Sequence, residues 1–234
     1  MLAGMFVEAG LELIITLPAT REKRADWLHR FAKRSMRRMG ITVTVHGRFP
    51  ERGSLITNHQ SYMDIVMLAS LHPCVFVSKA DLVRVPVLGW MTTMSGTVFV
   101  ERGRGGSALR ARAGLKAVAD AGLPVVFFPE GTTTNGVEML PFRSGLLAQA
   151  MGAPITAGYI RYTMDKGNGD DVSVEENVSW GDLPMFTHIF TFLGLRGVHA
   201  EVWFADQPVV FSSDGLHRKL AAVEAWTAVE ALNR

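Results

Sequence analysis

The feature that most constrains the fold of this chain is the regular alternation of short β-rich runs and helical stretches after Gly40. The runs are apolar and rich in β-branched or aromatic residues, and they predict strands at 41–46, 54–57, 74–77, 97–100, 124–128, 154–160 and 199–204. The stretches between them have helical periodicity and predict helices at 62–71, 86–94, 107–121, 143–151, 182–194 and 214–232. Such alternation predicts an α/β fold, in which helices cover both faces of a largely parallel mixed sheet.

Length and apolar content favour one principal domain. The 234 residues are 48% hydrophobic, which is ample for one large core and hardly enough for two. We therefore assign residues 40–234 to an α/β domain and residues 1–39 to an N-terminal helical arm. Cys74 is the only cysteine, so an internal disulfide framework is excluded. We expect a reducing compartment and no metal site.

The arm is predicted to form two amphipathic helices, the first of which ends at Pro18. Residues 21–38 contain eight Lys and Arg against Glu22 and Asp26, although the whole chain has a net charge of only +2. The apolar residues of the two predicted helices include Leu2, Phe6, Leu13, Leu17, Trp27 and Phe31. Helices of this kind either pack on the core or lie in an anionic membrane surface, and both interpretations remain open here.

The expected location follows from two absences in the sequence. No stretch has the roughly 20 apolar residues of a membrane span, and the N-terminus lacks the basic start of a secretory signal. If the arm binds a bilayer, the protein is a peripheral or monotopic protein on the cytoplasmic face of a membrane.

Three polar motifs directly follow three of the predicted strands. NHQSYMD at 58–64 follows SLIT, ERGRGG at 101–106 follows TVFV, and PEGTTTNG at 129–136 follows PVVFF. In open α/β sheets, ligands bind beyond the carboxyl ends of the strands. We therefore expect the three motifs to share one site.

His59 and Asp64 are five residues apart in the first motif, a spacing that separates side chains on a regular helix. We therefore place His59 at the end of a strand and Asp64 in the first turn of the next helix. A neutral imidazole can remove a proton near neutral pH, and a carboxylate bonded to its far nitrogen fixes its tautomer. Because no G-x-S-x-G nucleophile occurs and Cys74 lies in a predicted strand, His59 is expected to activate a substrate hydroxyl directly.

The other two motifs offer groups that bind anions. Arg102 and Arg104 lie in a glycine-rich loop, where they could hold an anionic group by charge-assisted hydrogen bonds. Backbone amides around Gly131 could form a donor nest for an oxyanion or a phosphate. Solvated loop arginines and a simple turn after the strand are the alternative interpretations.

Taken together, the motifs resemble the four ordered blocks of the glycerolipid acyltransferase family, which includes the 1-acylglycerol-3-phosphate (lysophosphatidate) O-acyltransferases. The blocks are NHQSYMD, GTVFVERGR, FPEGT with PFRSG, and APITAGYI, between residues 58 and 160. The resemblance implies transfer of a fatty acyl group from acyl-CoA or acyl-carrier protein to the free hydroxyl of a lysolipid, without a covalent acyl-enzyme. It implies 1-acylglycerol-3-phosphate as the main candidate acceptor, with phosphatidic acid as the product.

The resemblance also implies roles for individual residues. His59 corresponds to the general base of the family and Asp64 to its carboxylate partner. The substrate-binding residues implied are Asn58, Arg102, Arg104, Glu130, Gly131, Thr132 and Pro154. For a lipid acceptor, we expect residues 1–39 to be a membrane-binding arm that contacts an anionic surface through its apolar stripe together with Trp27 and Phe31. The implied partners are the membrane lipid acceptor, an anionic membrane surface and acyl-carrier protein as one of the two donors. No cofactor, metal or nucleic acid is implied.

One departure from the family pattern concerns the acceptor. Lysophosphatidate enzymes commonly have arginine directly after the third-block threonine, where this chain has Thr133. The EGTT pattern is similar to that of members that acylate lysophospholipids or lyso-ornithine lipid, so these are alternative acceptors. Two functions of other classes also remain, a phosphoester hydrolase that uses the same histidine and arginines, and a non-catalytic lipid-binding protein.

Overall fold

The computed structural model describes residues 2–16, 20–80, 88–100, 107–150, 152–181, 184–212 and 217–234. The strands are β1 (Thr42–His46), β2 (Ser54–Ile56), β3 (Val75–Lys79), β4 (Val98–Val100), β5 (Val125–Phe127), β6 (Ile155–Thr163) and β7 (His199–Phe204). The helices are α1 (Leu2–Thr16), α2 (Arg21–Met39), α3 (Met63–Leu71), α4 (Leu88–Met94), α5 (Ser107–Asp120), α6 (Ser144–Ala150), α7 (Met185–Gly194) and α8 (Arg218–Glu230). A 3-10 turn, η2 (Lys166–Asn168), and a π-helical turn, η3 (Val174–Val178), follow β6.

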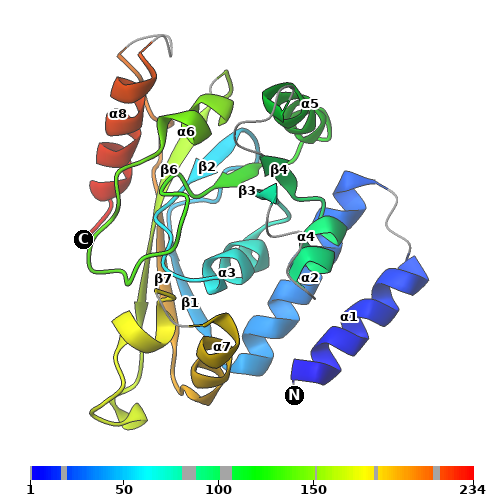
Figure 1. The fold of residues 1–234 in the computed structure, drawn as a ribbon, viewed down its shortest axis with the longest axis vertical. Helices are drawn as coiled ribbons and strands as arrows, with labels where there is room; N and C mark the ends of the chain where they lie inside the picture. The colour runs from blue at the N-terminus through cyan, green and yellow to red at the C-terminus, as the bar shows by residue number, and fades with distance from the viewer. Residues whose placement is uncertain are drawn as a thin grey trace.

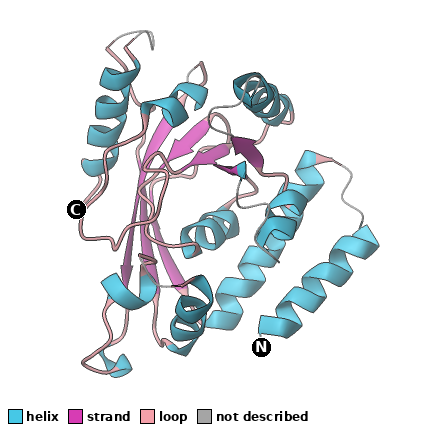
Figure 2. Cartoon of the chain, viewed as in Figure 1, coloured by secondary structure: helices cyan, strands magenta, loops and turns pink. Residues whose placement is uncertain are grey.

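The strands form one sheet in the order β1-β7-β6-β2-β5-β3-β4, with helices on either side of it (Figures 1 and 2). Neighbouring strands are parallel except β6 and β7, which are antiparallel. The predicted fold class, a largely parallel mixed α/β sheet, is therefore confirmed. Because β2, β5 and β6 are parallel, their carboxyl ends lie at one edge, which is where the polar motifs begin.

Each face of the sheet has its own hydrophobic core. Val126 and Phe128 contribute to a cluster with α1, α2, α3 and α7, whereas Val125 and Phe127 contribute to a second cluster with α5, α6 and α8. This division follows from strand geometry, since successive side chains point to opposite faces. Both faces of the central strands are buried, as their continuous apolar sequence requires.

The described elements follow the predicted ones with small shifts at the ends. β6 continues three residues beyond the predicted end at 160, because its pairing with β7 extends to Thr163 opposite His199. Gly40 ends α2 in the left-handed conformation, with φ 69°, as its position after the basic run predicts. Pro18 and the predicted starts of the helices at 86, 182 and 214 lie outside the described residues. The two turns η2 and η3 were not predicted.

The structure corrects the expectation for the aromatic residues of the arm. Trp27 and Phe31 are 0% and 6% exposed, and their rings stack 5.8 Å apart within the core cluster. They are buried because α2 packs against α3, which makes this apolar face part of the domain interior. Neither residue is therefore available to a membrane, and Leu13 of α1 is buried as well.

Helix α1 pairs with α2 through charged side chains. Arg30 and Arg34 both contact Glu12, and Arg38 contacts Glu8 at 2.8 Å. These contacts neutralise three of the basic residues that the arm was expected to present to an anionic surface. Leu17, and the side chains of Leu2 and Phe6, lie outside what the structure describes. Over the described ranges, no helix is both long enough and apolar enough to cross a bilayer.

Candidate active site

His59 and Asp64 form a hydrogen-bonded pair at the carboxyl end of β2. The His59 Nδ1 atom lies 2.8 Å from Asp64 Oδ2, and the two side chains are 14% and 0% exposed. His59 follows the strand and Asp64 lies in the first turn of α3, as the spacing predicted. The turn between them brings them together, because the amides of Gln60 and Ser61 donate to the same Oδ2 atom, at 2.7 and 2.9 Å.

The other oxygen of Asp64 has a partner that the sequence did not reveal. The Tyr162 hydroxyl donates to Asp64 Oδ1 over 2.7 Å, and both residues are buried. Burial, together with the charge of Asp64, raises the pKa of Tyr162 well above its ordinary value, so its hydroxyl remains a donor. The carboxylate thus accepts bonds at both oxygens, which fixes its orientation toward His59.

The imidazole of His59 is held on its face as well as at its edge. Its ring stacks on Phe128, with centroids 3.9 Å apart and planes 15° apart. Because Nδ1 is engaged by Asp64, the second nitrogen, Nε2, is the one open to a substrate. No described residue bonds to Nε2. This is the arrangement that a general base requires.

Glu130 holds the backbone of the histidine. One carboxyl oxygen accepts from the His59 amide and the other from the Leu140 amide, each over 2.7 Å, and the residue is 1% exposed. Burial raises the pKa of Glu130 to about 7; the nearby charge of Asp64 acts in the same direction and the two amides oppose it. Each oxygen thus accepts a backbone amide of the protein, so the contacts of Glu130 fix the backbone at His59 and Leu140. The implied role of Glu130 in substrate binding stays a prediction.

The loop after Glu130 closes around the same histidine. Gly131 adopts φ 71°, and its amide donates to the Phe128 carbonyl over 3.0 Å, so this amide is used within a turn. The Thr134 amide donates to the His59 carbonyl over 2.9 Å. No described residue accepts from the amides of Thr132 or Thr133. A donor for an oxyanion would therefore come from these two amides rather than from Gly131.

The side chain of Asn58 bonds to the backbone of β6. Its side chain donates to the Ile160 carbonyl over 2.9 Å and accepts from the Ile160 amide over 2.7 Å. It is 4% exposed, and the Gln60 side chain also donates to the Ile160 carbonyl. These bonds give Asn58 a structural role, because they continue the pairing of β2 with β6, and its implied role in substrate binding stays a prediction.

Pro154 lies at the opposite edge of the sheet from His59. Its carbonyl accepts from the Ser54 amide over 2.8 Å, at the amino ends of the parallel strands β6 and β2. The six residues from Ser54 to His59 separate these edges by about 20 Å if extended. The structure therefore does not bring Pro154 to the site. The residue that reaches Asp64 from this strand is Tyr162.

The remaining predicted residues divide into two groups. Thr132 lies in the loop beside Glu130 and is exposed, whereas Arg102 and Arg104 lie outside the described residues.

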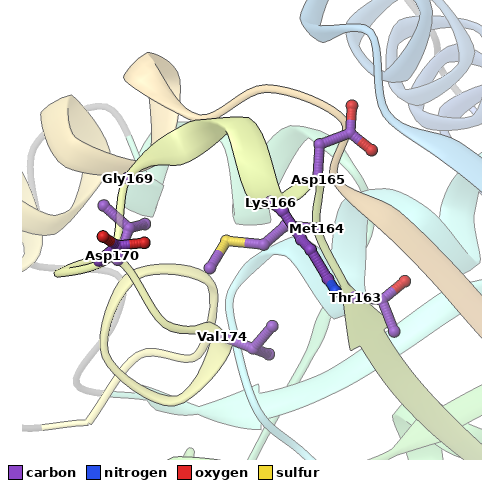
Figure 3. A pocket seen from close by; sticks show the side chains of 8 residues that line it. Thr163, Met164, Asp165, Lys166, Gly169, Asp170 and Val174 are labelled. Carbon is purple, nitrogen blue, oxygen red and sulfur yellow. The ribbon is translucent and has the colours of Figure 1, made fainter.

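Among the described residues, no group of His, Cys, Asp or Glu has the arrangement of a metal site. An open hollow of about 470 Å³ lies at the end of β6 (Figure 3), and none of its lining residues belongs to the three motifs.

Comparison with known proteins identifies similar sequences. The Acyltransferase family matches residues 40–161, which include the dyad and the Glu130 loop. The lyso-ornithine lipid O-acyltransferase of Pseudomonas aeruginosa is 34% identical over 80% of this chain and 70% of that protein. The 1-acyl-sn-glycerol-3-phosphate acyltransferase of Neisseria gonorrhoeae is 33% identical over 47% of this chain and 44% of that protein.

A solved structure shares the fold. The crystal structure of the 1-acyl-sn-glycerophosphate acyltransferase PlsC from Thermotoga maritima superposes with a TM-score of 0.60, covering 92% of this chain and 82% of that one. At 22% sequence identity, this likeness supports the architecture of the sheet and its helices.

Proposed function

The chain belongs to the Acyltransferase family, and from this membership and the geometry of its site we propose how it works and on which lipid. It is an O-acyltransferase that moves a fatty acyl group to the free hydroxyl of a lysolipid. The family assignment favours this activity over a phosphoester hydrolase or a non-catalytic lipid-binding protein. The observation that carries the mechanism is the hydrogen-bonded His59–Asp64 pair, in which Asp64 is buried.

In the proposed mechanism, His59 Nε2 removes the proton from the lysolipid hydroxyl. The hydroxyl oxygen then attacks the thioester carbonyl carbon, the new C–O bond forms, and the C–S bond breaks. The departing thiolate takes the proton from the imidazolium. Asp64 stabilises the imidazolium while it exists, and Tyr162 and the amides of Gln60 and Ser61 hold Asp64 in place.

The acyl donor in this proposal is a thioester of CoA or of acyl-carrier protein, and no cofactor is needed because a thioester is already activated. Direct attack by the hydroxyl requires no cysteine nucleophile, and the single cysteine of the chain is unsuited to that role. Cys74 is fully buried at the start of β3, and burial raises the pKa of its thiol, so it is a poor nucleophile.

We propose lyso-ornithine lipid as the acceptor. A relative that bears this name aligns over 80% of the chain, and the third block has Thr133 in place of the arginine common in lysophosphatidate enzymes. The second candidate is 1-acylglycerol-3-phosphate, which is supported by the name of the Neisseria relative. In either case Arg102 would bind an anionic group of the acceptor, and Arg104, two residues further along the chain, would assist it.

The deciding experiment offers both acceptors with both donors. Purified protein is incubated with a radiolabelled acyl donor, either acyl-CoA or acyl-carrier protein loaded with the acyl group. The acceptor is either lyso-ornithine lipid or 1-acylglycerol-3-phosphate, and the product is identified by chromatography. We expect diacylated ornithine lipid to form fastest. Faster formation of phosphatidic acid would reverse the order of the two acceptors, and no transfer to any lysolipid would refute the proposed activity.

The substrates of this enzyme are lipids, and we propose that α1 brings the enzyme to the cytoplasmic face of the membrane. Val7, Leu11 and Ile14 are 61%, 54% and 70% exposed, and their spacing places them on one face of α1. This face is opposite the side that pairs with α2, so it is free to enter the headgroup boundary. Lys33 and Arg37, both exposed on α2, would add attraction to anionic lipids.

Paired substitutions test this role of α1. Replacing Val7 and Leu11 with glutamine should reduce flotation with anionic vesicles. The matched control replaces Leu220 and Val223 of α8, which are also exposed, and should float as the wild type does. Equal flotation of all three proteins would show that α1 does not bind the membrane.

A further inference from the structure

Helix α7 is a surface helix without a charged side chain. Its sequence, MFTHIFTFLG, contains no Lys, Arg, Asp or Glu. By contrast, α8, also on the surface, has basic residues at its start and Glu224 and Glu230 further along. A helix that meets only water is normally polar on its outer face. The uncharged composition of α7 is therefore unusual for a helix of this length whose outer face meets only water.

The inner face of α7 packs against the catalytic motif. His188 is fully buried, with Nε2 bonded to the Ser179 carbonyl at 2.8 Å and Nδ1 lying 3.2 Å from the Tyr62 hydroxyl. The rings of His188 and Phe192 also meet the edge or face of Tyr62, at 5.6 and 6.2 Å. Tyr62 lies two residues before Asp64, so α7 is a direct neighbour of the segment that carries the dyad.

The outer face of α7 presents an aromatic ring to the surroundings. Phe190 is 74% exposed, and among the residues of α7 whose exposure the structure describes, Thr187, Thr191 and Gly194 are exposed near it on this face. The Thr191 hydroxyl donates to the Thr187 carbonyl over 3.1 Å, so its polar group is satisfied within the helix. Arg196, which is exposed, lies two residues beyond the end of the helix. An exposed aromatic ring on an uncharged face, with a basic residue near the end of the helix, suits the boundary between lipid chains and headgroup phosphates.

We propose that this outer face of α7, centred on Phe190, is a second membrane contact that seats the catalytic motif at the lipid surface. The proposal rests on the proposed function, because a lysolipid acceptor reaches the site from a bilayer. In Figure 1, α7 and the start of α1 lie at the same end of the longest axis of the molecule, so one bilayer surface is within reach of both. A second copy of the chain is a weaker candidate for the partner, since one phenylalanine covers far less than the roughly 1,200 Å² of a stable interface.

The test compares two exposed side chains of nearly equal accessibility. Phe190→Gln removes the ring from α7, and the control Leu109→Gln removes a side chain that is 72% exposed on α5. Both proteins are floated with vesicles of uncharged phosphatidylcholine, which removes the electrostatic contribution. We expect Phe190→Gln to bind about tenfold more weakly than wild type, the loss of one inserted aromatic side chain, and Leu109→Gln to bind as wild type.

A gain-of-signal variant covers the case in which Phe190→Gln folds poorly. Phe190→Trp keeps an aromatic ring, and its added fluorescence should be quenched by vesicles containing brominated lipid chains, whereas the added fluorescence of Leu109→Trp should not. Absence of quenching at position 190, or equal quenching at both positions, would overturn the proposal. So would a wild-type dimer in solution that Phe190→Gln converts to a monomer.

Activity separates this inference from the proposed function. Phe190→Gln should lose activity on acceptor embedded in vesicles and keep activity on a short-chain acceptor dispersed as monomers. If it keeps full activity on both, α7 is not a membrane contact. If wild type transfers no acyl group to either acceptor, the proposed function fails, while flotation and quenching still decide whether α7 enters the bilayer.

Discussion

Between pH 4.5, the ordinary pKa of the Glu130 carboxyl, and about pH 7, its pKa in the folded protein, the stability of the wild type should depend on pH. Replacing Glu130 by glutamine should remove this dependence. The carboxyl is buried and accepts the amides of His59 and Leu140. Burial is the largest cause of the raised pKa, because the charged form loses its hydration. The substitution keeps the shape of the side chain and makes it neutral at every pH.

The sign follows from proton binding. Because the pKa is higher in the folded state, the folded protein binds more protons than the unfolded chain between pH 4.5 and about 7. The free energy of unfolding therefore falls as the pH rises through this range. At about 1.4 kcal/mol for each pH unit, the shift from 4.5 to about 7 corresponds to about 3 kcal/mol. Below pH 4.5 both states are protonated and the contribution of this group to stability is fully present.

Urea unfolding at about pH 5 and pH 8 measures the effect. Between these two conditions the free energy of unfolding of wild type should fall by about 2 to 3 kcal/mol more than that of Glu130→Gln, because pH 5 lies slightly inside the range of the shift. The variant should also be less stable at pH 5, since one of the two amides loses its acceptor. Glu138→Gln, a change at an exposed carboxyl of the same loop, is the control and should follow the wild type. Parallel pH dependence of wild type and Glu130→Gln would refute this reasoning.

Three further predictions concern acyl transfer. His59→Ala should lower kcat by about 100- to 10,000-fold and Asp64→Asn should lose most activity, with circular dichroism unchanged; near wild-type turnover by either would refute the dyad. Tyr162→Phe, which removes only the donor to Asp64, should lower kcat about tenfold and leave the KM of the acceptor unchanged, whereas a rise in KM alone would place Tyr162 in substrate binding. Arg102→Ala should raise the KM of the acceptor far more than that of the thioester, and equal effects on both would contradict a role in binding the headgroup.

Several features of this protein could be read from local sequence. The alternation of strand and helix patterns predicted the α/β sheet, since periodicity records which faces are buried. The His59–Asp64 pair could also be predicted, because both residues belong to one short strand-to-helix turn and the chain itself brings them together. The loop at 129–136 was correctly placed beside them by the rule for the carboxyl ends of parallel strands.

Other features depended on contacts between distant parts of the chain. Tyr162 reaches Asp64 across 98 residues, and the Glu130 carboxylate reaches the His59 amide across 71, so no local pattern marks either bond. For the same reason the sequence could not separate buried Trp27 and Phe31 from exposed Val7 and Phe190, since all four are apolar residues in helices with apolar faces. Periodicity tells which side of a helix is apolar, but only the packing of α2 on α3 and of α7 on Tyr62 decides which apolar side chains are covered.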